Sequence, residues 1–449
     1  MRAPARLAAA LIALGLLAVA CTASGTEPVE RPTGGPSPTS VPTSPEVVPS
    51  PETGPGSALA ALEELCTLPE PGVDEGSDVP AEGRTPPVIT KAMRELEQIR
   101  GFGFSRPVVA DAVTQAQIAE GYADYLDEAF PEGFYERRSL AWQTIGVIPD
   151  GTNIRDELLG YGSTEVIGYY DTLTGELVFI GTQDPSPLER ITLVHELTHA
   201  IDDQRFGLET IDRLGAECRD EELEAALALV EGDATFFMLR WAQTFLTLEE
   251  QLQVGVDAAT QDTSASGDIA PFIEALQLWP YEAGLTFITN LSSRGGVEAI
   301  DDAFEDLPTS TEQVIHPERY PNDVPIPVDV PDLAGALGSG WEDLDVQHVG
   351  EAWLVLMLRL RLDGSDPSEA SAGWDGGLYR AWSDGDDVAV VLATEWDSEG
   401  DAQEFADAMG RWIAAGDDLG VVLPVDRTSV RVVFASDAAT LASLGAGAA

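Results

Sequence analysis

Positive charge is what this sequence has least of. Its 449 residues contain a single lysine, Lys91, and 24 Lys and Arg residues stand against 78 Asp and Glu, a formal net charge of −54. Nucleic-acid-binding proteins present basic surfaces to phosphates, and anionic lipid headgroups attract basic segments. The composition therefore excludes nucleic-acid partners and disfavours direct binding to an anionic membrane surface.

Long apolar runs are also scarce, and only the N-terminus carries one. Leu7–Ala20 follows Arg2 and Arg6; it is too short for a mature membrane span but has the length of a signal-peptide core. The run ends at Cys21 in a stretch that resembles a bacterial lipobox. We therefore predict a signal peptide over residues 1–20 and lipidation of Cys21, the alternative being an ordinary secretory signal.

Residues 21–57 are predicted to form an extended tether. Between residues 28 and 57 lie nine Pro, five Ser, four Thr and four Gly. Such a segment buries too little apolar surface to offset its ordering entropy. A tether behind a lipid anchor places the folded part outside the cytoplasm, held to the membrane only through Cys21.

Cysteine is the next scarce residue, with three in the chain. Outside the cytoplasm, the remaining pair, Cys66 and Cys218, predicts a disulfide. Two buried free thiols are the alternative reading of the same pair.

The folded part is predicted to be α+β and mostly helical. A β-hairpin, from strands over 165–171 and 176–181, precedes a helix over 186–206. We expect one domain over 58–340, followed over 341–449 by a C-terminal helix and a small α+β unit. Further helices are predicted over residues 58–65, 88–100, 114–130, 221–241, 280–291, 297–304, 344–362 and 401–414, and strands over 378–382, 388–394 and 429–435.

Two of the four histidines occur in one pentapeptide, His195-Glu196-Leu197-Thr198-His199. Chance alone would produce this pattern in roughly 0.003 of chains with this composition. On a helix, positions i and i+4 share a face, so both imidazoles can bind one metal ion. Ser186 and Glu189 form a capping box that supports the helix. The pattern predicts a zinc site in which Glu196 can reach a metal-bound water rather than the metal itself.

A catalytic zinc site needs a third protein ligand. Arg205 stands where the metzincin extension requires histidine, so that class is excluded. Glu231 is favoured because it lies within an apolar stretch of the next strong helix, where a carboxylate needs a partner. Gly232 beside it allows a close helix approach. The alternatives for the third ligand are Asp202, Asp203, Glu217 and Glu224.

The motif, followed by Val230-Glu231-Gly232-Asp233-Ala234, resembles the gluzincin zinc metallopeptidases, specifically the peptidase MA-like proteins. The resemblance extends over most of residues 88–410. It includes further segments that look like signatures of secreted members of this group, namely 99–102, 168–171 with 175–177, 280–284, 310–317 and 373–376.

The resemblance implies a zincin-like fold and a role for each motif residue. His195, His199 and Glu231 would hold one Zn²⁺ per chain, and Glu196 would be general base and later proton donor. The hairpin strand over 176–181 would be an edge strand that pairs with extended substrate. One departure concerns the outer contacts of the site, because Thr235 stands where many gluzincins have an acidic residue.

Gluzincins often use a distant His or Tyr to stabilise the developing oxyanion. His316, Tyr320 and Tyr281 are the candidates for this role, while a structural His316 that caps the turn before Pro317 is the alternative. His348 is interpreted as structural. The C-terminal tryptophans are interpreted as core, with a sugar- or peptide-binding surface as the alternative; they are Trp341, Trp353, Trp374, Trp382, Trp396 and Trp412.

Together these features predict an extracytoplasmic, lipid-anchored zinc metallopeptidase acting on a peptide or protein substrate. Two alternatives stay open. The first is a non-catalytic binding or structural lipoprotein on a zincin fold, which the intact His-Glu-x-x-His argues against. The second is a zinc hydrolase of cell-wall amide bonds, which the acidic surface disfavours for anionic wall polymers.

Overall fold

The computed structural model describes residues 56–66, 85–260 and 269–448, apart from residues 165, 167, 173 and 181–184. The predicted signal peptide, the lipidation site at Cys21 and nearly all of the tether lie outside these residues. No helix among the described residues is long and apolar enough to cross a membrane.

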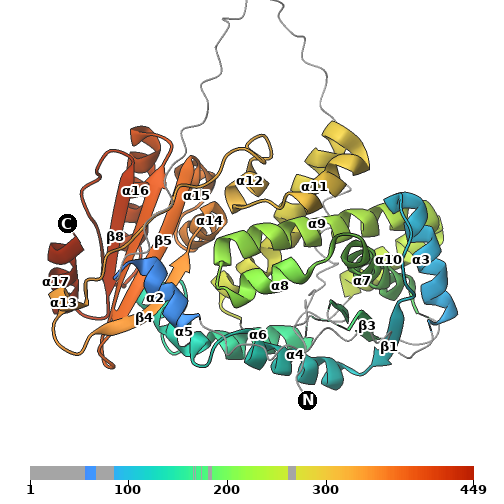
Figure 1. The fold of residues 1–449 in the computed structure, drawn as a ribbon, viewed down its shortest axis with the longest axis horizontal. Coiled ribbons are helices and arrows are strands. Elements are labelled where there is room, and N and C mark those ends of the chain that lie inside the picture. Colours follow the sequence, from blue (N-terminus) through green and yellow to red (C-terminus); the bar gives the residue numbers. More distant parts are fainter. Residues whose placement is uncertain are drawn as a thin grey trace, which may run out of the picture.

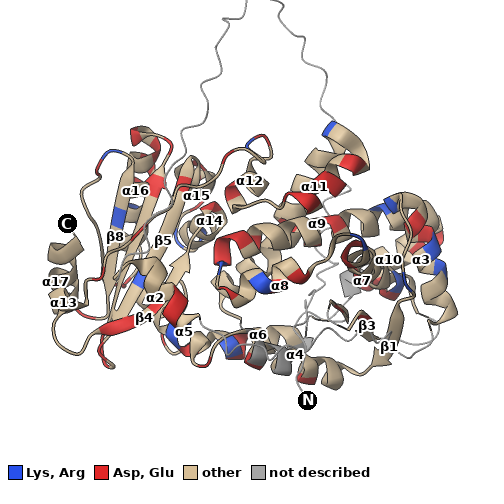
Figure 2. Ribbon diagram, in the orientation of Figure 1, with Lys and Arg blue, Asp and Glu red and all other residues tan. Residues whose placement is uncertain are grey.

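The molecule has two parts built around different sheets, which confirms the α+β class (Figure 1). A mainly helical part with a three-stranded sheet forms one end. A five-stranded antiparallel sheet with its own helices forms the other. Acidic residues occur on helices of both parts, with few basic ones between them (Figure 2).

The small sheet holds β1 (Val109–Val113), β2 (Gly168–Asp171) and β3 (Glu176–Ile180). β2 and β3 form the predicted antiparallel hairpin. The prediction that the strand over 176–181 is an edge strand is wrong, because β1 pairs with β3 in parallel and leaves β3 in the centre. β1 was not predicted as a strand, so its pairing was not foreseen.

The helical part is arranged around two long helices, α7 (Pro187–Phe206) and α9 (Asp220–Phe245), with α11 (Pro271–Glu305) packed along α9. The two helices predicted over 280–291 and 297–304 both lie within α11, and the backbone leaves helical geometry between them at Gly296, with φ 72° and ψ −154°. The other helices of this part are α3 (Pro87–Arg100), α4 (Gln115–Ala129), α5 (Phe134–Ile145), α6 (Ile154–Thr164), α8 (Glu209–Ala216), α10 (Leu248–Thr260) and α12 (Thr311–Ile315).

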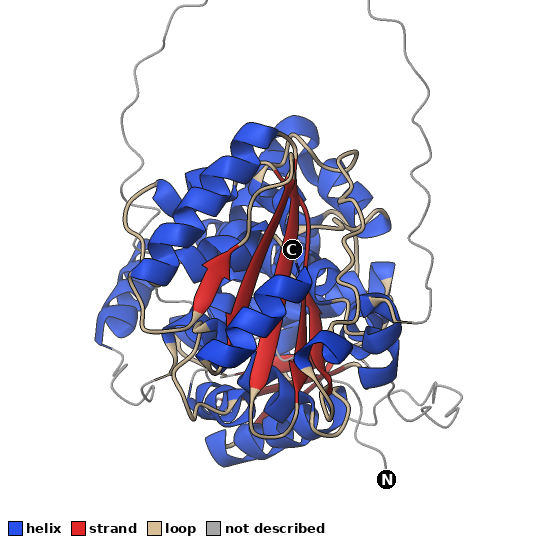
Figure 3. Ribbon diagram, turned by 90° about the vertical axis from the view of Figure 1, so that its left-hand side faces the viewer, coloured by secondary structure: helices blue, strands red, loops and turns tan. Residues whose placement is uncertain are grey.

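The five-stranded sheet has the order β4-β5-β6-β8-β7, with all neighbours antiparallel. Figure 3 faces this part and shows its strands flanked by helices. Its strands are β4 (Glu342–His348), β5 (Trp374–Ser383), β6 (Val388–Trp396), β7 (Gly420–Val422) and β8 (Ser429–Ala435), and its helices are α13 (Ala334–Leu337), α14 (Glu351–Arg359), α15 (Asp366–Ser371), α16 (Glu399–Ala414) and α17 (Ala438–Ala448).

The single helix predicted over 344–362 is wrong. Residues 342–348 form β4, and the helix begins only at Glu351, after Gly350 in an extended conformation. β4 pairs with β5, which lies about thirty residues further along the chain. The apolar run was read as one helix because the local pattern does not show this partner.

Each of the two parts is stabilised by a large hydrophobic core. One is centred on the five-stranded sheet and includes α5 and α2 (Ala58–Leu65), both of which pack on β4. The other lies between α3, α7, α9 and α11. Five of the six C-terminal tryptophans are buried in the first core, in agreement with their interpretation as core residues; they are Trp353, Trp374, Trp382, Trp396 and Trp412.

Candidate metal centre

Helix α7 carries the His-Glu-x-x-His motif in a buried position. Its start is fixed by the predicted capping box: the Glu189 N–H donates to Ser186 Oγ at 3.2 Å, and the Ser186 N–H donates to the Glu189 carboxylate at 2.6 Å. Every residue from Ile191 to Asp202 is buried. His195 and His199, one turn apart, therefore lie inside the protein rather than on its surface.

Helix α9 brings Glu231 to the two histidines, and close packing against α11 holds it in place. A Cβ atom on Gly232 would overlap the backbone of Gly284 in α11, and one on Gly284 would overlap the carbonyl group of Ala228. The two helices thus pack backbone to backbone beside Glu231. This confirms the close approach predicted from Gly232.

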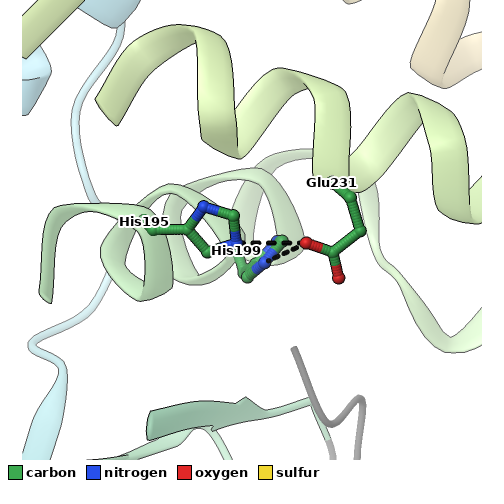
Figure 4. Close-up of side chains that lie close together, drawn as sticks. All are labelled: His195, His199 and Glu231. Carbon is green, nitrogen blue, oxygen red and sulfur yellow. Dashed lines mark hydrogen bonds and ion pairs between the residues drawn. The ribbon is translucent and has the colours of Figure 1, made fainter. Parts of the chain in front are cut away.

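The three side chains form one compact group (Figure 4). Glu231 Oε2 lies 3.1 Å from His195 Nε2 and 3.5 Å from His199 Nε2. One ligand atom from each residue lies within 4.8 Å of the others. Two imidazole nitrogens and a carboxylate oxygen that converge on one point can hold a metal ion.

Three ring nitrogens of the two histidines are buried without a hydrogen-bond partner among the described residues. They are His199 Nε2, which lies on the side of Glu231 where a cation would bind, and the Nδ1 atoms of both rings. Buried polar groups in native proteins are nearly always hydrogen-bonded. The side chains fit a metal ion, although the contacts that usually orient ligand imidazoles are absent from the described residues, as the departure at Thr235 suggested.

The electrostatics of the group also suit a cation. Burial by itself raises the pKa of Glu231, but His199 and His195 lower it to about 2. Burial opposes charge on His199, yet Glu231 raises its pKa, while burial lowers the pKa of His195. The ionised Glu231 is the form that a metal ligand needs, and burial favours the neutral form of His195; the negative charge that raises the pKa of His199 is one that a metal cation would compensate.

Glu196 lies next to this group without belonging to it. Both of its carboxylate oxygens are buried and lack hydrogen-bond partners in the described part of the chain. Burial raises the pKa of Glu196 to about 8. Gly168 of β2 faces it, since a Cβ at Gly168 would lie 3.6 Å from Glu196 Cγ. The arrangement places this carboxyl group beside the candidate metal ligands, and a cation bound there would lower its pKa and favour the ionised, proton-accepting form.

Of the three candidates for oxyanion stabilisation, the structure brings only Tyr281 to the group. Its ring stacks on His195 at 6.0 Å between centroids, and burial together with Glu231 keeps its pKa well above the ordinary value, so it remains a donor. His316 Nε2 lies 3.0 Å from Glu351 Oε1. Tyr320 donates to the Asp306 carbonyl at 2.5 Å.

The alternative third ligands lie elsewhere. Asp202 accepts from Arg100, and Asp203 accepts from the Tyr170 hydroxyl at 2.8 Å. Glu217 lies near Arg219. Glu224 precedes Glu231 by two helical turns and lines a cavity. Glu231 is thus the acidic residue that completes the group.

A second buried cluster on the same two helices was missed from the sequence. Arg100, fully buried, lies 3.0 Å from Asp202 of α7 and 3.5 Å from Asp233 of α9, and it also pairs with Asp301 of α11. Its guanidinium carbon lies over the ring of Phe102 at 4.6 Å and within 6 Å of three further Phe rings. Arg100 belongs to the segment 99–102, whose resemblance to a family signature was the sequence feature that could have drawn attention to this cluster.

The predicted disulfide between Cys66 and Cys218 is present in the structure. It joins the end of α2 to the turn between α8 and α9, so it connects the sheet core to the helix that carries Glu231. His348 ends β4, and burial lowers its pKa. It is not part of the metal group, in keeping with its structural interpretation.

Comparison with known proteins reaches only the C-terminal part. Residues 341–444 match a domain of unknown function (DUF8575), which coincides with the five-stranded sheet and its helices. No curated protein and no solved structure matches the chain. The metal centre lies outside the matched residues.

Proposed function

We propose that the chain is a zinc-dependent metallopeptidase of gluzincin type with a zincin-like fold. One observation carries the proposal: His195, His199 and Glu231 converge in the protein interior, with the unpartnered carboxylate of Glu196 beside them. A structural zinc site would be closed by a fourth protein ligand, whereas three ligands leave a position open for chemistry.

Zinc fits the distances in the group. Ligand atoms about 2.0–2.1 Å from a tetrahedral zinc ion lie roughly 3.4 Å from one another. The measured separations from Glu231 Oε2 to the two Nε2 atoms are 3.1 and 3.5 Å. Two imidazoles and one carboxylate are also a donor set of catalytic zinc.

In this proposal each residue has one role. A zinc ion held by the three ligands would polarise the scissile carbonyl and make water more acidic. Glu196 accepts a proton from the attacking water at a carboxylate oxygen and passes it to the leaving amine. Tyr281, which keeps its proton, donates toward the negative charge that develops on the carbonyl oxygen.

The proposal is tested with the isosteric Glu196→Gln variant. We expect it to bind zinc as the wild type does and to lose peptide hydrolysis by about 10²–10⁴-fold, because the proton acceptor is gone. Mass spectrometry of a peptide-library digest measures the loss. Glu249→Gln, an exposed change on neighbouring α10, is the matched control and should stay active.

Three outcomes would redirect the proposal. Undiminished hydrolysis by Glu196→Gln would remove Glu196 from the mechanism. Zinc binding by a wild type that cleaves no peptide would favour the binding lipoprotein. Cleavage restricted to purified cell wall would favour the wall-amide hydrolase.

We further propose that this enzyme works outside the cytoplasm on peptide or protein substrates, tethered through lipidated Cys21. The Cys66–Cys218 disulfide supports this location, because disulfides persist in oxidising compartments. Labelling with a radioactive fatty acid, lost in Cys21→Ala, tests the anchor.

A further inference from the structure

A cavity of about 360 Å³ lies between the two parts of the molecule, outside the metal group. This volume is in the range of small-molecule sites. The cavity is walled by α4, α5, α6, α8 and α9 and closed on one side by β4 and α14. Six aromatic residues line it, namely Tyr122, Phe130, Phe134, Tyr135, Trp142 and Trp353.

Two polar atoms from the cavity lining are buried without a hydrogen-bond partner in the described part of the chain. They are Glu224 Oε1, a carboxyl oxygen, and Trp353 Nε1, an indole donor. A group left unpaired in the interior costs free energy. Glu224 as a whole is half-buried, so a ligand in the cavity that offers a donor to its carboxyl group would reduce this cost.

The charge in the cavity favours a cation. Arg138 is the lining residue with a fixed positive charge, and it is already paired with Asp220 at 3.0 Å and Asp345 at 2.6 Å. Asp212, Glu221 and Glu224 remain. Glu221 accepts from the Thr311 backbone and hydroxyl, and Asp212 accepts from Thr172, so Glu224 is the carboxyl left for a ligand. Aromatic walls stabilise organic cations further.

The cavity lies along the same helix faces as the metal ligands. On α9, Asp220, Glu224, Leu227 and Glu231 follow one another at spacings of three or four residues, which places them on one face. Glu224 and Glu231 are therefore roughly 10 Å apart along the helix axis. An extended peptide covers this distance in about three residues.

We propose that this cavity receives an arginine or lysine side chain of the substrate, with the cationic end at Glu224 and the stem among the aromatic rings. This proposal names a substrate preference for the proposed peptidase, so it rests on that proposed function. The cavity sets specificity at a residue about three positions from the scissile bond.

The protonation of Glu224 should make cation binding in this cavity depend on pH. Burial raises the pKa of Glu224 to about 8, so the empty cavity holds the neutral acid at lower pH, and a cation must displace that proton. Cation affinity should therefore rise with pH and level off above about pH 8. The charged and titratable groups that line the cavity with Glu224 are Tyr122 of α4, Tyr135 and Arg138 of α5, Asp212 of α8, Asp220 and Glu221 of α9, and His348 of β4.

The first test uses benzamidine, an aromatic cation, and benzamide, its neutral counterpart, in calorimetric titrations of the full chain. We expect benzamidine to bind at least about tenfold more tightly, with proton release below about pH 8. Glu224→Gln should abolish the preference. Glu222→Gln, on the same helix but outside this cavity, should retain it.

A steric variant keeps the test independent of charge. Leu227→Phe narrows the cavity and should weaken benzamidine binding even if Glu224→Gln folds poorly. Equal binding of benzamidine and benzamide, or unchanged binding in both variants, would overturn the cation site.

A second test connects the cavity to catalysis. Peptides that differ only by arginine or its neutral analogue citrulline are compared for kcat/KM, and we expect at least about a tenfold preference for arginine. Benzamidine binding without any hydrolysis would contradict the peptidase but not the cation site. Hydrolysis without preference for arginine would contradict the substrate role of the cavity but not the peptidase.

Discussion

Helices α7 and α9 build two buried polar clusters side by side, and the clusters differ in one respect. His199 and Asp202 lie three residues apart on α7, and Glu231 and Asp233 lie two residues apart on α9. In one cluster, Asp202 and Asp233 face the guanidinium group of Arg100 at 3.0 and 3.5 Å. In the other, Glu231 meets two imidazoles and no side-chain cation of fixed charge lies among them.

The difference agrees with the roles proposed for the two clusters. The Arg100 cluster is closed in its charge, since its guanidinium group lies within 3.5 Å of three carboxyl groups, joins α3, α7, α9 and α11, and sits among four aromatic rings. Atoms without a hydrogen bond among the described residues occur in both clusters, Asp233 in one and Glu196 in the other. The histidine cluster is open in its charge, because within the described part of the chain Glu231 is paired with the two imidazoles and with no arginine or lysine. The chain supplies the cation where rigidity is needed and leaves it to be bound where chemistry is proposed.

The largest loss of stability is expected when Arg100 is removed from the closed cluster. Arg100→Met leaves Asp202 and Asp233 buried without their cation, and removing one partner of a buried ion pair costs about 3–5 kcal/mol. Denaturant unfolding measures the loss. Arg205→Met is the control, because Arg205 is exposed over two of the same rings, Phe102 and Phe206, and should cost no more than about 0.5 kcal/mol. Equal losses would mean that Arg100 acts through ring packing alone.

Filling the open cluster should have the opposite effect. Zinc at about a hundredfold excess over its Kd should raise the free energy of unfolding by about 2.7 kcal/mol, because it binds the folded chain. Thermal unfolding with and without zinc checks this in the wild type and in Glu231→Gln. The variant should gain little, and an equal gain would place the bound zinc elsewhere.

A smaller effect is expected where α9 and α11 support both clusters. Gly232→Ala forces the two backbones apart and should cost about 1–3 kcal/mol while weakening zinc binding through Glu231. Gly255→Ala in α10 has open space around the new methyl group and should stabilise the chain by about 0.5–1 kcal/mol. Destabilisation of the same size by both changes would contradict the close-packing argument.

The sequence predicts the open cluster better than the closed one for a physical reason. A helix with its own cap sets the spacing of His195 and His199, so these residues can be read locally. Glu231 could be predicted as the third ligand because a carboxylate within an apolar stretch needs a partner. Arg100 and Asp301 are 201 residues apart, and no local pattern connects them.

The same limit explains the errors in the fold. β3 became a central strand through a parallel partner, β1, that lies 67 residues earlier in the register of Val109 with Glu176. β4 became a strand through β5. In both cases tertiary pairing decided the structure, whereas the strands and helices with strong local signals, such as 429–435 and 58–65, lie where they were predicted.

The zinc content of three purified full-length chains tests the central claim most directly. We predict one zinc ion per chain in the wild type, retention in Asp233→Asn, where the amide can replace a carboxyl in the closed cluster, and loss in Glu231→Gln. Elemental mass spectrometry after zinc reconstitution gives the answer. Zinc retained in Glu231→Gln, or absent from the wild type, would contradict the account.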